Sequence, residues 1–330
     1  MWPKPLPKKN VEISTKLHKM SSSYKVDVEK AVGHESAPEK VSFNRRDLLL
    51  YALAVGVKED ELQYLYELDP NFTGLPFYPI VLPLKGSGSD INSYKERSSG
   101  APTPGIPPFD GNKLVHGEQT LEVINPIPTN GGDFIVQKKL TGVYDKGSGM
   151  VLESTATMTD ASGKVYTKMV SKAFVRGYGG WNGPKGPKPV SRAPPKRNPD
   201  AVDTFKTGAN QALLYRLSGD YNPLHADIEL APRVGFPKPI LHGLCSFGIS
   251  AHAILKALGE NDASRFKSIE ARFASPVFPG ETLETYMWKV EGPSAGEEGV
   301  IFVTKVKERD IVVINNGYVV LKKAAGQSKL

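Results

Sequence analysis

Three polar side chains that can move protons or hold water are close together in residues 215–225 (YRLSGDYNPLH). They are Asp220, Asn222 and His225. Gly219 and Pro223 interrupt the helical pattern here, because proline lacks an N–H group and disfavours helix for the residue before it. We therefore expect an irregular connection after a helix that presents the three side chains. Binding and catalytic groups are commonly held on such loops.

A second segment, residues 239–255 (PILHGLCSFGISAHAIL), has the apolar spacing of a helix that begins near His242-Gly243. A helix start exposes unpaired N–H groups and the positive end of the helix dipole. Glycine at 243 would let a substrate oxygen approach this backbone closely. An acid/base pair beside a backbone site for a negative oxygen, without a nucleophile, indicates proton transfer next to a carbonyl group.

Each of these residues also has an ordinary structural explanation. Asp220 could be a helix cap, His225 a hydrogen-bonded surface residue and Gly243 a turn. His242 could support the site from behind or simply be a structural histidine at a helix start. Cys245, the single cysteine, follows on the expected helix and is expected to be a small buried residue.

The 330-residue chain is long enough for two domain-sized units or one large one, and its hydrophobic share of 39% suits a sizeable core. No run approaches the roughly 18 apolar residues that a membrane helix needs, so we expect no membrane span. One cysteine excludes an internal disulfide and a multi-cysteine zinc site. Three further histidines show no ligand spacing, and no metal site is expected; they are His18, His34 and His252.

The formal net charge of +7 raises the question of a nucleic-acid partner. Part of the excess lies in residues 184–198 (PKGPKPVSRAPPKRN), where basic residues alternate with prolines rather than with aromatic residues. Because no base-stacking platform is evident, we expect a solvated linker and no nucleic-acid partner. The general positive field could still attract an anionic substrate.

Two pairs of segments indicate an internal duplication. LLYALAVG (49–56) is similar to LLYRLSGD (213–220), and GEQTLE (117–122) to GETLET (280–285), at offsets of 164 and 163 residues. Such spacing predicts two units, each an antiparallel sheet wrapped on a long apolar helix, which is an α+β arrangement. The expected strands are 121–127, 134–146, 150–160 and 164–177 in the first unit and 268–277, 282–292, 300–310 and 311–323 in the second.

The expected organisation has five parts. They are a flexible or peripheral extension (1–40), a first unit (41–180), a Pro/Lys-rich linker (181–199), a second unit (200–324) and a tail (325–330). The first unit lacks the D-x-N-P-x-H pattern, so its interior is predicted to bind an apolar tail instead. Residues 85–111 form a long loop rich in Ser, Gly and Pro, which is either functional or disordered.

The sequence ends in Ser328-Lys329-Leu330, which matches the address read by the peroxisomal import receptor. This tripeptide predicts that receptor as a partner and the peroxisomal matrix as the location.

Five segments, in the same order, resemble the MaoC-like (R)-specific enoyl-CoA hydratases known as hydratase 2. They are LVHGEQ (114–119), YDKGSG (144–149), YRLSGDYNPLH (215–225), GFPKPILHGLC (235–245) and ARFASPVFPGETL (271–283). The resemblance covers about residues 40–324 and implies a double hot-dog fold. It also implies reversible hydration of trans-2-enoyl-CoA to (3R)-3-hydroxyacyl-CoA in peroxisomal β-oxidation, without a cofactor beyond the coenzyme A of the substrate.

By this resemblance Asp220 and His225 are the catalytic pair, Asn222 helps to hold the water, and the Gly243 N–H binds the thioester oxygen. The resemblance also implies contacts with the acyl-CoA, at His116, Gly117, Lys146, Tyr221, Pro223, Leu224 and Phe273. Without it, Lys146 would be taken for a turn lysine, Phe273 for a core residue and His116 for a strand-edge histidine. The sequence leaves open which of the catalytic pair is the base.

Three readings compete. The first is hydration as above, in which a backbone donor aimed at the developing oxyanion contributes roughly 3–4 kcal/mol and each acid/base step about 10²–10⁴-fold. The others are a MaoC-like dehydratase acting on a different acyl thioester and a non-catalytic acyl-CoA-binding protein. A nicotinamide-binding fingerprint is excluded because Gly177-Tyr178-Gly179 is followed by Asn182 where glycine or alanine is required. A homodimer is expected, and the preferred acyl chain length stays open.

Overall fold

The computed structural model describes residues 25–98, 102–188 and 190–324. The predictions for residues 1–24 and for the terminal tripeptide lie outside these residues. In the described part, no helix has both the length and the apolar character to cross a bilayer.

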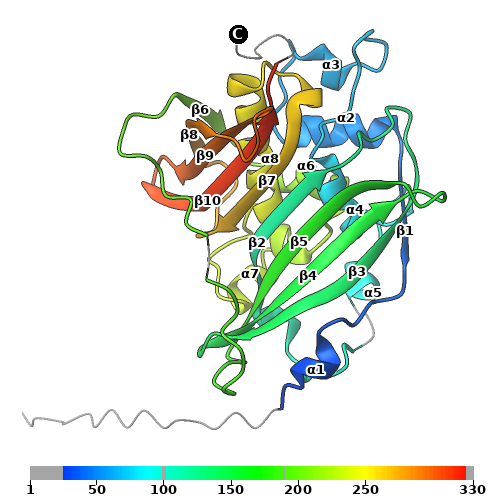
Figure 1. The fold of residues 1–330 in the computed structure, drawn as a ribbon, viewed down its shortest axis with the longest axis vertical. Helices are drawn as coiled ribbons and strands as arrows, with labels where there is room; N and C mark the ends of the chain where they lie inside the picture. The colour runs from blue at the N-terminus through cyan, green and yellow to red at the C-terminus, as the bar shows by residue number, and fades with distance from the viewer. Residues whose placement is uncertain (1–24, 99–101, 189, 325–330) are drawn as a thin grey trace, which may run out of the picture.

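One antiparallel sheet of ten strands dominates the fold (Figure 1). Its spatial order is β1-β3-β4-β5-β2-β7-β10-β9-β8-β6. The strands are β1 (Glu39–Phe43), β2 (Leu114–Val123), β3 (Gly132–Asp145), β4 (Gly149–Thr159), β5 (Val165–Arg176), β6 (Ala201–Lys206), β7 (Phe266–Phe273), β8 (Thr282–Glu291), β9 (Glu297–Val306) and β10 (Ile311–Lys322).

The two halves of this sheet have the same topology. From the outer edge to the centre, each half runs first, third, fourth, fifth and second strand of its unit, so β1 corresponds to β6 and β2 to β7. The units meet where β2 pairs with β7, from Glu118↔Arg272 to Glu122↔Ser268. This repeated order confirms the predicted duplication and the α+β class.

Of the two sequence matches behind that prediction, one relates equivalent elements of the two units and the other does not. LLYALAVG and LLYRLSGD lie in the equivalent helices α2 (Arg45–Ala54) and α6 (Gln211–Tyr215) with the residues that follow them. GEQTLE, however, lies in β2, the second strand of its unit, whereas GETLET begins β8, the third strand. The second match therefore relates strands that are not equivalent, and it was a coincidence.

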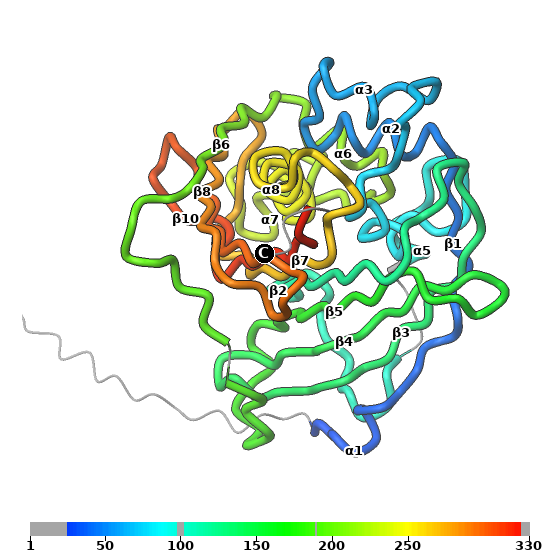
Figure 2. Tube along the Cα trace, turned by 45° about the horizontal axis from the view of Figure 1, so that its top comes forward, coloured from blue at the N-terminus to red at the C-terminus, as the bar shows by residue number. Residues whose placement is uncertain are grey.

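Helix α8 (Gly243–Leu258) is the long helix on which the second half of the sheet is wrapped. Figure 2 shows it nearly end on, with strands β6 to β10 curving around it. Its residues are apolar on almost every side, and Phe247, Ile254 and Leu255 are fully buried. Its start at Gly243 is the start that the sequence predicts. In the described part of the first unit, shorter helices fill the interior, namely η1 (Tyr78–Val81) and α4 (Leu82–Lys85).

Residues 25–40 pack against the first unit, although the sequence places them in a flexible or peripheral extension. They contain α1 (Val28–Ala31), capped by the Asp27 side chain. The N–H groups of Gly33 and Ser36 donate to carbonyls of β3, at Leu140 and Lys138. Ala31 also joins a small apolar cluster with Leu140. These contacts fix the segment on β3, so the folded part of the chain begins earlier than position 41.

The remaining short elements connect the layers. They are α3 (Leu62–Leu65), α5 (Tyr94–Ser98), η2 (Gly111–Lys113), η3 (Arg216–Ser218), η4 (Pro223–His225), α7 (Leu230–Arg233) and η5 (Ala263–Arg265). The sequence predicts none of the edge strands, because β1 and β6 have only five and six residues with few apolar side chains. The other eight strands correspond to the predicted ones, with shifted bounds.

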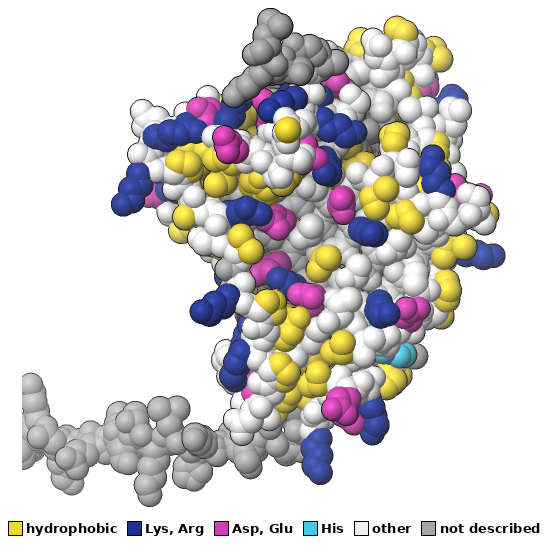
Figure 3. All heavy atoms as spheres, in the orientation of Figure 1, with side chains coloured by type: hydrophobic (Ala, Val, Ile, Leu, Met, Phe, Trp, Pro, Cys, Tyr) yellow, Lys and Arg dark blue, Asp and Glu magenta, His cyan; other side chains and the backbone are white. Residues whose placement is uncertain are grey.

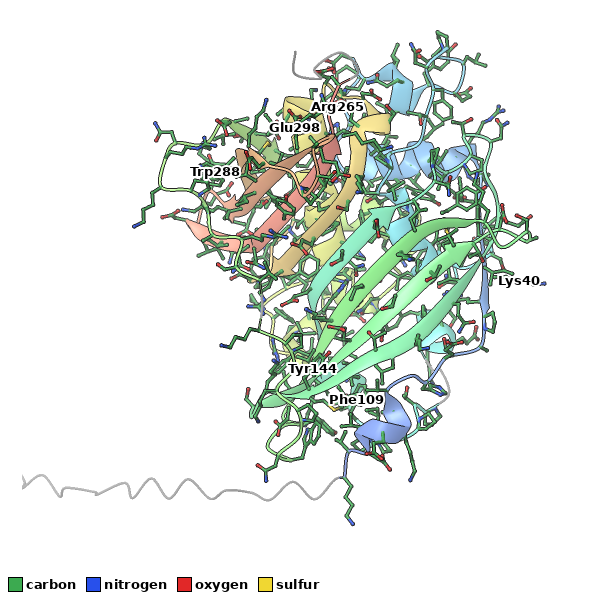
Figure 4. The ribbon with its side chains drawn as sticks, viewed as in Figure 1. Lys40, Phe109, Tyr144, Arg265, Trp288 and Glu298 are labelled. Atoms are coloured by element: carbon green, nitrogen blue, oxygen red, sulfur yellow. The ribbon has the colours of Figure 1, made fainter. Side chains whose placement is uncertain are left out.

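The linker between the units follows the second half of the sheet and is held there near its middle and at its end. Near its middle, the Arg192 guanidinium lies 3.9 Å over the Tyr318 ring of β10, and its Nε donates to Glu270 of β7 at 2.9 Å. At its end, Trp288 of β8 donates its indole N–H to the Arg197 carbonyl at 3.0 Å (Figure 4). The predicted solvated linker is thus tied to the sheet by several side chains.

Basic and acidic side chains are interspersed on the outer face of the sheet rather than gathered by sign (Figure 3). At the junction of the units, Glu118 of β2 forms ion pairs with Lys172 of β5 and Arg272 of β7, at 2.7 Å each. Neighbouring strands therefore neutralise one another's charges across the junction.

A buried carboxylate ties the helical layers of the two units together. Glu61, only 3% exposed, accepts hydrogen bonds from His252 and Asn261 at 2.8 Å and lies 3.1 Å from the Lys256 ammonium. Burial alone would raise the pKa of Glu61, but the hydrogen bonds and charges around it, chiefly those of His252, lower it to about 2.

We expect Glu61→Ala to lower the free energy of unfolding by about 3–5 kcal/mol, because His252, Lys256 and Asn261 then lose their shared acceptor in the interior. Urea denaturation measures the change, and Glu59→Ala, at an exposed acid two positions away, is the control. The folded pKa of about 2 lies below the ordinary value of 4.5. The contribution of Glu61 is therefore complete above pH 4.5 and is lost as the pH falls through about 2. A variant as stable as the control would contradict this role.

Candidate active site

The connection after α6 and η3 carries Asp220 and depends on glycine. Gly219 has φ 130°, a conformation that side chains rarely adopt. A Cβ on Gly219 would also lie 2.5 Å from the Cβ of Lys85, which belongs to α4 of the first unit. The loop that presents Asp220 is therefore pressed directly against the other unit.

Asn222 shapes the next turn. Its backbone N–H donates to the Asp220 carboxylate at 3.3 Å, and its own side-chain oxygen accepts from the Leu224 N–H at 3.0 Å. This cap begins η4, where Pro223 supplies a first position that needs no N–H partner. The hydrogen bonds of the described residues leave the Asn222 side-chain NH₂ group free, so it can donate to a bound oxygen.

His225 lies at the end of η4 and is only 9% exposed. Its Nδ1 is 2.9 Å from the Ile240 carbonyl, so Nδ1 carries the proton and donates it there. Burial lowers the pKa of His225, while the charge of Asp220 and the bond to Ile240 oppose that shift. The imidazole is thus neutral at pH 7, with an unprotonated Nε2.

His242 completes the cluster. It is 1% exposed, and its Nε2 lies 3.1 Å from the main-chain carbonyl of Asp220, to which it donates. Its ring stacks on that of His225, with 3.7 Å between centroids and 27° between planes. Burial lowers the pKa of His242 well below its ordinary range, and the neighbouring His225 lowers it further.

The ligand-type atoms of Asp220, His225 and His242 all lie within 4.8 Å of one another, a grouping that could hold a metal ion. The two rings are stacked, however, so their nitrogen lone pairs lie in nearly parallel planes instead of converging on one point. One nitrogen of each ring also donates to a backbone carbonyl. This geometry suits the handling of a proton better than the sharing of an ion.

Gly243, the first residue of α8, faces the same cluster. The His242 carbonyl accepts from Cys245 and Ser246, at 3.0 and 3.3 Å. Among the described residues no acceptor is present for the Gly243 N–H, which therefore remains available to an oxygen of a ligand. A Cβ at Gly243 would lie 3.2 Å from the Phe273 ring, so glycine keeps this approach open.

The first unit contributes His116, which lies beside Phe273. The pairing of β2 with β5 shifts register between His116 and Glu118, which places Gly117 at a bulge. Bulges re-aim neighbouring side chains, and here the His116 ring lies 4.9 Å from that of Phe273. Burial lowers the pKa of His116, although a hydrogen bond to Gln119 and the charge of Asp220 oppose the shift. Because Phe273 also lies beside Gly243, His116 is placed near the start of α8.

The other residues predicted to contact the acyl-CoA lie away from the cluster of Asp220, His225 and His242 or at its edge. Lys146 sits in the turn between β3 and β4, beside Tyr144 at the lower end of the sheet (Figure 4), and donates to the Lys185 carbonyl. None of its contacts with described residues reaches the cluster. Tyr221 is half-buried, and the Arg216 guanidinium lies 5.2 Å from its ring. Pro223 and Leu224 form η4 and are also half-buried.

Tyr94, on α5, is a neighbour that the sequence did not reveal. Burial raises the pKa of Tyr94, and the negative charge of Asp220 raises it further. The segment is fixed by Asn92, which donates to the Leu84 and Lys85 carbonyls at 3.2 and 2.8 Å. The only signal in the sequence was the unusual length of loop 85–111, which does not single out Tyr94.

Two family descriptions match the chain, one for each unit. Residues 41–177 match the MFE-2 hydratase 2 N-terminal domain, and residues 190–311 match the MaoC like domain. A peroxisomal enoyl-CoA hydratase 2 of Arabidopsis thaliana is 38% identical over 87% of this chain and 93% of that protein. The peroxisomal multifunctional enzyme type 2 of Mus musculus is 40% identical over 90% of this chain, which spans 39% of that longer protein.

Solved structures agree with the fold. A MaoC-like dehydratase from Phytophthora capsici superimposes with a TM-score of 0.83 and 41% identity, over 92% of this chain and all of that chain. A Mycobacterium tuberculosis protein described as a double hotdog fold superimposes with a TM-score of 0.55 at 11% identity, over 89% of this chain and 97% of that chain, which supports the fold alone. The predicted double hot-dog fold is confirmed. The chain belongs to the MaoC-like hydratase 2 family and is a hydro-lyase.

Proposed function

We propose that the protein hydrates trans-2-enoyl-CoA to (3R)-3-hydroxyacyl-CoA and catalyses the reverse dehydration. The observation that carries the proposal is the pairing of His225 with the Asp220 carboxylate, whose ligand-type atoms lie within 4.8 Å of one another, with the Nδ1 of His225 bonded to Ile240 and its Nε2 without a hydrogen-bond partner among the described residues. The names of relatives such as the Arabidopsis enoyl-CoA hydratase 2 support the substrate.

His225 is the group that takes the proton from water. Its Nδ1 proton is committed to the Ile240 carbonyl, so only Nε2 can accept, and burial favours the neutral ring that this step requires. The resulting imidazolium is stabilised by the Asp220 carboxylate, which favours the charged ring. The pair then returns one proton to Cα, so water is added across the double bond and both groups end in their starting state.

The Gly243 N–H binds the thioester oxygen, on which negative charge develops as the hydroxide adds to Cβ. The N-terminal end of α8 adds the positive end of the helix dipole at this point. The free NH₂ group of Asn222 holds the water oxygen, while His116 and Phe273 form the wall beside the thioester.

The acyl tail is expected to run toward the first unit, as the sequence predicts. In this structure the interior of that unit is filled by aromatic side chains, namely Tyr51, Tyr64, Phe77 and Tyr78, each at most 1% exposed. A long tail therefore requires these side chains or the segment around Tyr94 to move aside. The preferred chain length depends on that rearrangement.

A second candidate is dehydration of a different acyl thioester. A 3-hydroxyacyl-thioester dehydratase Y of Mycobacterium tuberculosis is 34% identical over 88% of this chain and 96% of that protein. Comparing the rate for coenzyme A thioesters with that for carrier-protein thioesters separates the two candidates. Binding without turnover of either substrate would instead indicate an acyl-CoA-binding protein.

Relatives with peroxisomal names support a peroxisomal setting in β-oxidation, together with the tripeptide Ser328-Lys329-Leu330. Import of a fluorescent fusion with and without these three residues tests that setting. The homodimer remains a prediction, which sedimentation velocity can check. The proposed reaction needs no cofactor beyond the coenzyme A of the substrate.

We expect Asp220→Asn and His225→Gln each to lower kcat for hydration of trans-2-decenoyl-CoA by about 10²–10⁴-fold, because each removes one partner of the proton-transferring pair. Chiral analysis of the wild-type product should give the (3R) alcohol. Glu229→Gln, at an exposed acid on the same connection, is the matched control and should retain full activity. A (3S) product, or unchanged activity in folded Asp220→Asn, would refute the proposal.

The pH dependence follows from the state of His225. Because the base must be neutral, kcat/KM falls as the pH drops through the pKa of His225. Burial lowers that pKa from its ordinary value of 6.5, so the fall should come below pH 6.5 and activity at pH 7 should be undiminished. A kcat/KM profile measured from pH 5 to 8 checks this. A profile that rises toward low pH would show that His225 acts first as an acid.

A further inference from the structure

The proposed mechanism leaves one buried titratable group of the cluster without a role. His242 is 1% exposed and touches both members of the pair, yet the proposed reaction gives neither of its nitrogens a role. Its Nε2 is committed to the Asp220 carbonyl, and its Nδ1 has no hydrogen-bond partner among the described residues.

The bond from His242 to Asp220 goes to the backbone and not to the carboxylate. At 3.1 Å, it fixes the orientation of the peptide between Asp220 and Tyr221, directly after the turn at Gly219. Among the described residues, the Asp220 carboxylate accepts a hydrogen bond from the Asn222 N–H. His242 therefore anchors the catalytic loop to the start of the rigid helix α8, from which the Gly243 N–H also projects.

The ring of His242 holds His225 in a different way. The two imidazoles stack with 3.7 Å between centroids, so His242 covers one face of the catalytic ring and keeps water from it. Tyr215 of α6 packs on His242 with ring centroids 4.9 Å apart and supports the stack. The charged groups that influence this stack are Asp220 and Arg216, from the loop and from η3.

We propose that His242 is a positioning residue, which fixes Asp220 through its Nε2–H and fixes and desolvates His225 through its ring face. The inference rests on the proposed function and extends it. His242 itself stays neutral throughout, since burial and its neighbour both disfavour its charged form. It acts on catalysis only through the two residues it holds.

Two substitutions separate these contributions. His242→Gln can still donate to the Asp220 carbonyl but loses the aromatic face, whereas His242→Phe keeps the face and loses the donor. His252→Gln is the matched control, because His252 is another buried histidine, on the helix that His242 precedes, and is bonded to Glu61 instead of Asp220. It should lower stability without altering the kinetic profile.

We expect His242→Phe to lower kcat by about 10²-fold with KM nearly unchanged, because a small displacement of a catalytic group has that order of effect. Its kcat/KM profile should keep the wild-type acidic limb. His242→Gln should lower kcat by only about 10-fold and move the acidic limb to higher pH, since water reaches His225 and relieves the burial that lowers its pKa.

A readout independent of activity completes the test. Nitrogen-15 histidine NMR of the full-length protein reports the tautomer and titration of His225, whose signals are assigned by their loss in His225→Gln. The His225 pKa should rise in His242→Gln and stay in place in His242→Phe. Equal losses of kcat in both variants with an unmoved His225 titration, or activity within about twofold of wild type in both, would overturn the proposal.

These experiments distinguish a wrong proposed function from a wrong role of His242. If the wild type does not hydrate enoyl-CoA, the proposed function falls, while the NMR comparison still shows whether His242 controls the state of His225. If the wild type is active and the NMR and kinetic signatures of the variants do not differ, the positioning role falls and the proposed function stands.

Discussion

The antiparallel pairing of β2 with β7 is the constraint on which the rest of the structure depends. It joins two sheets of five strands into one and sets the register between the units. The pairing begins at Glu118↔Arg272, so His116 and Gly117 lie just beyond it, on the first unit, next to Phe273 on the second. A slip of one residue would turn His116 to the opposite face of the sheet.

Within this sheet, the proposed chemistry depends on the burial of the site rather than on a cluster of charged side chains. Two stacked imidazoles are kept neutral by burial, and a single carboxylate beside them favours the charged form of one ring. Each ring donates one hydrogen bond to a backbone carbonyl, which fixes the tautomer of the ring. The loop, the segment before α8 and the helix start supply these carbonyls and the free N–H of Gly243, so backbone groups act beside the side chains in the site.

The loop that carries Asp220 and the start of α8 could be predicted from the sequence, because both are local features. The turn at Gly219 and Pro223 and the apolar spacing after Gly243 can be recognised from neighbouring residues alone. The stacking of His242, the approach of Tyr94 and the contact with Lys85 could not be predicted, since they depend on which segments the sheet brings together. The mistaken equivalence of β2 and β8 has the same origin, because short strand motifs do not reveal their place in a sheet.

The contact between Gly219 and Lys85 has a consequence for how the duplicated chain can change. The first unit lacks the acid/base motif, so that motif places no constraint on its helices. Lys85 is nevertheless buried against the turn that carries Asp220, and its ammonium is held by Asp47 and by the Ser42 and Gly88 carbonyls. The half without the motif thus helps to shape the turn that carries Asp220, so substitutions that touch this turn are constrained in both halves.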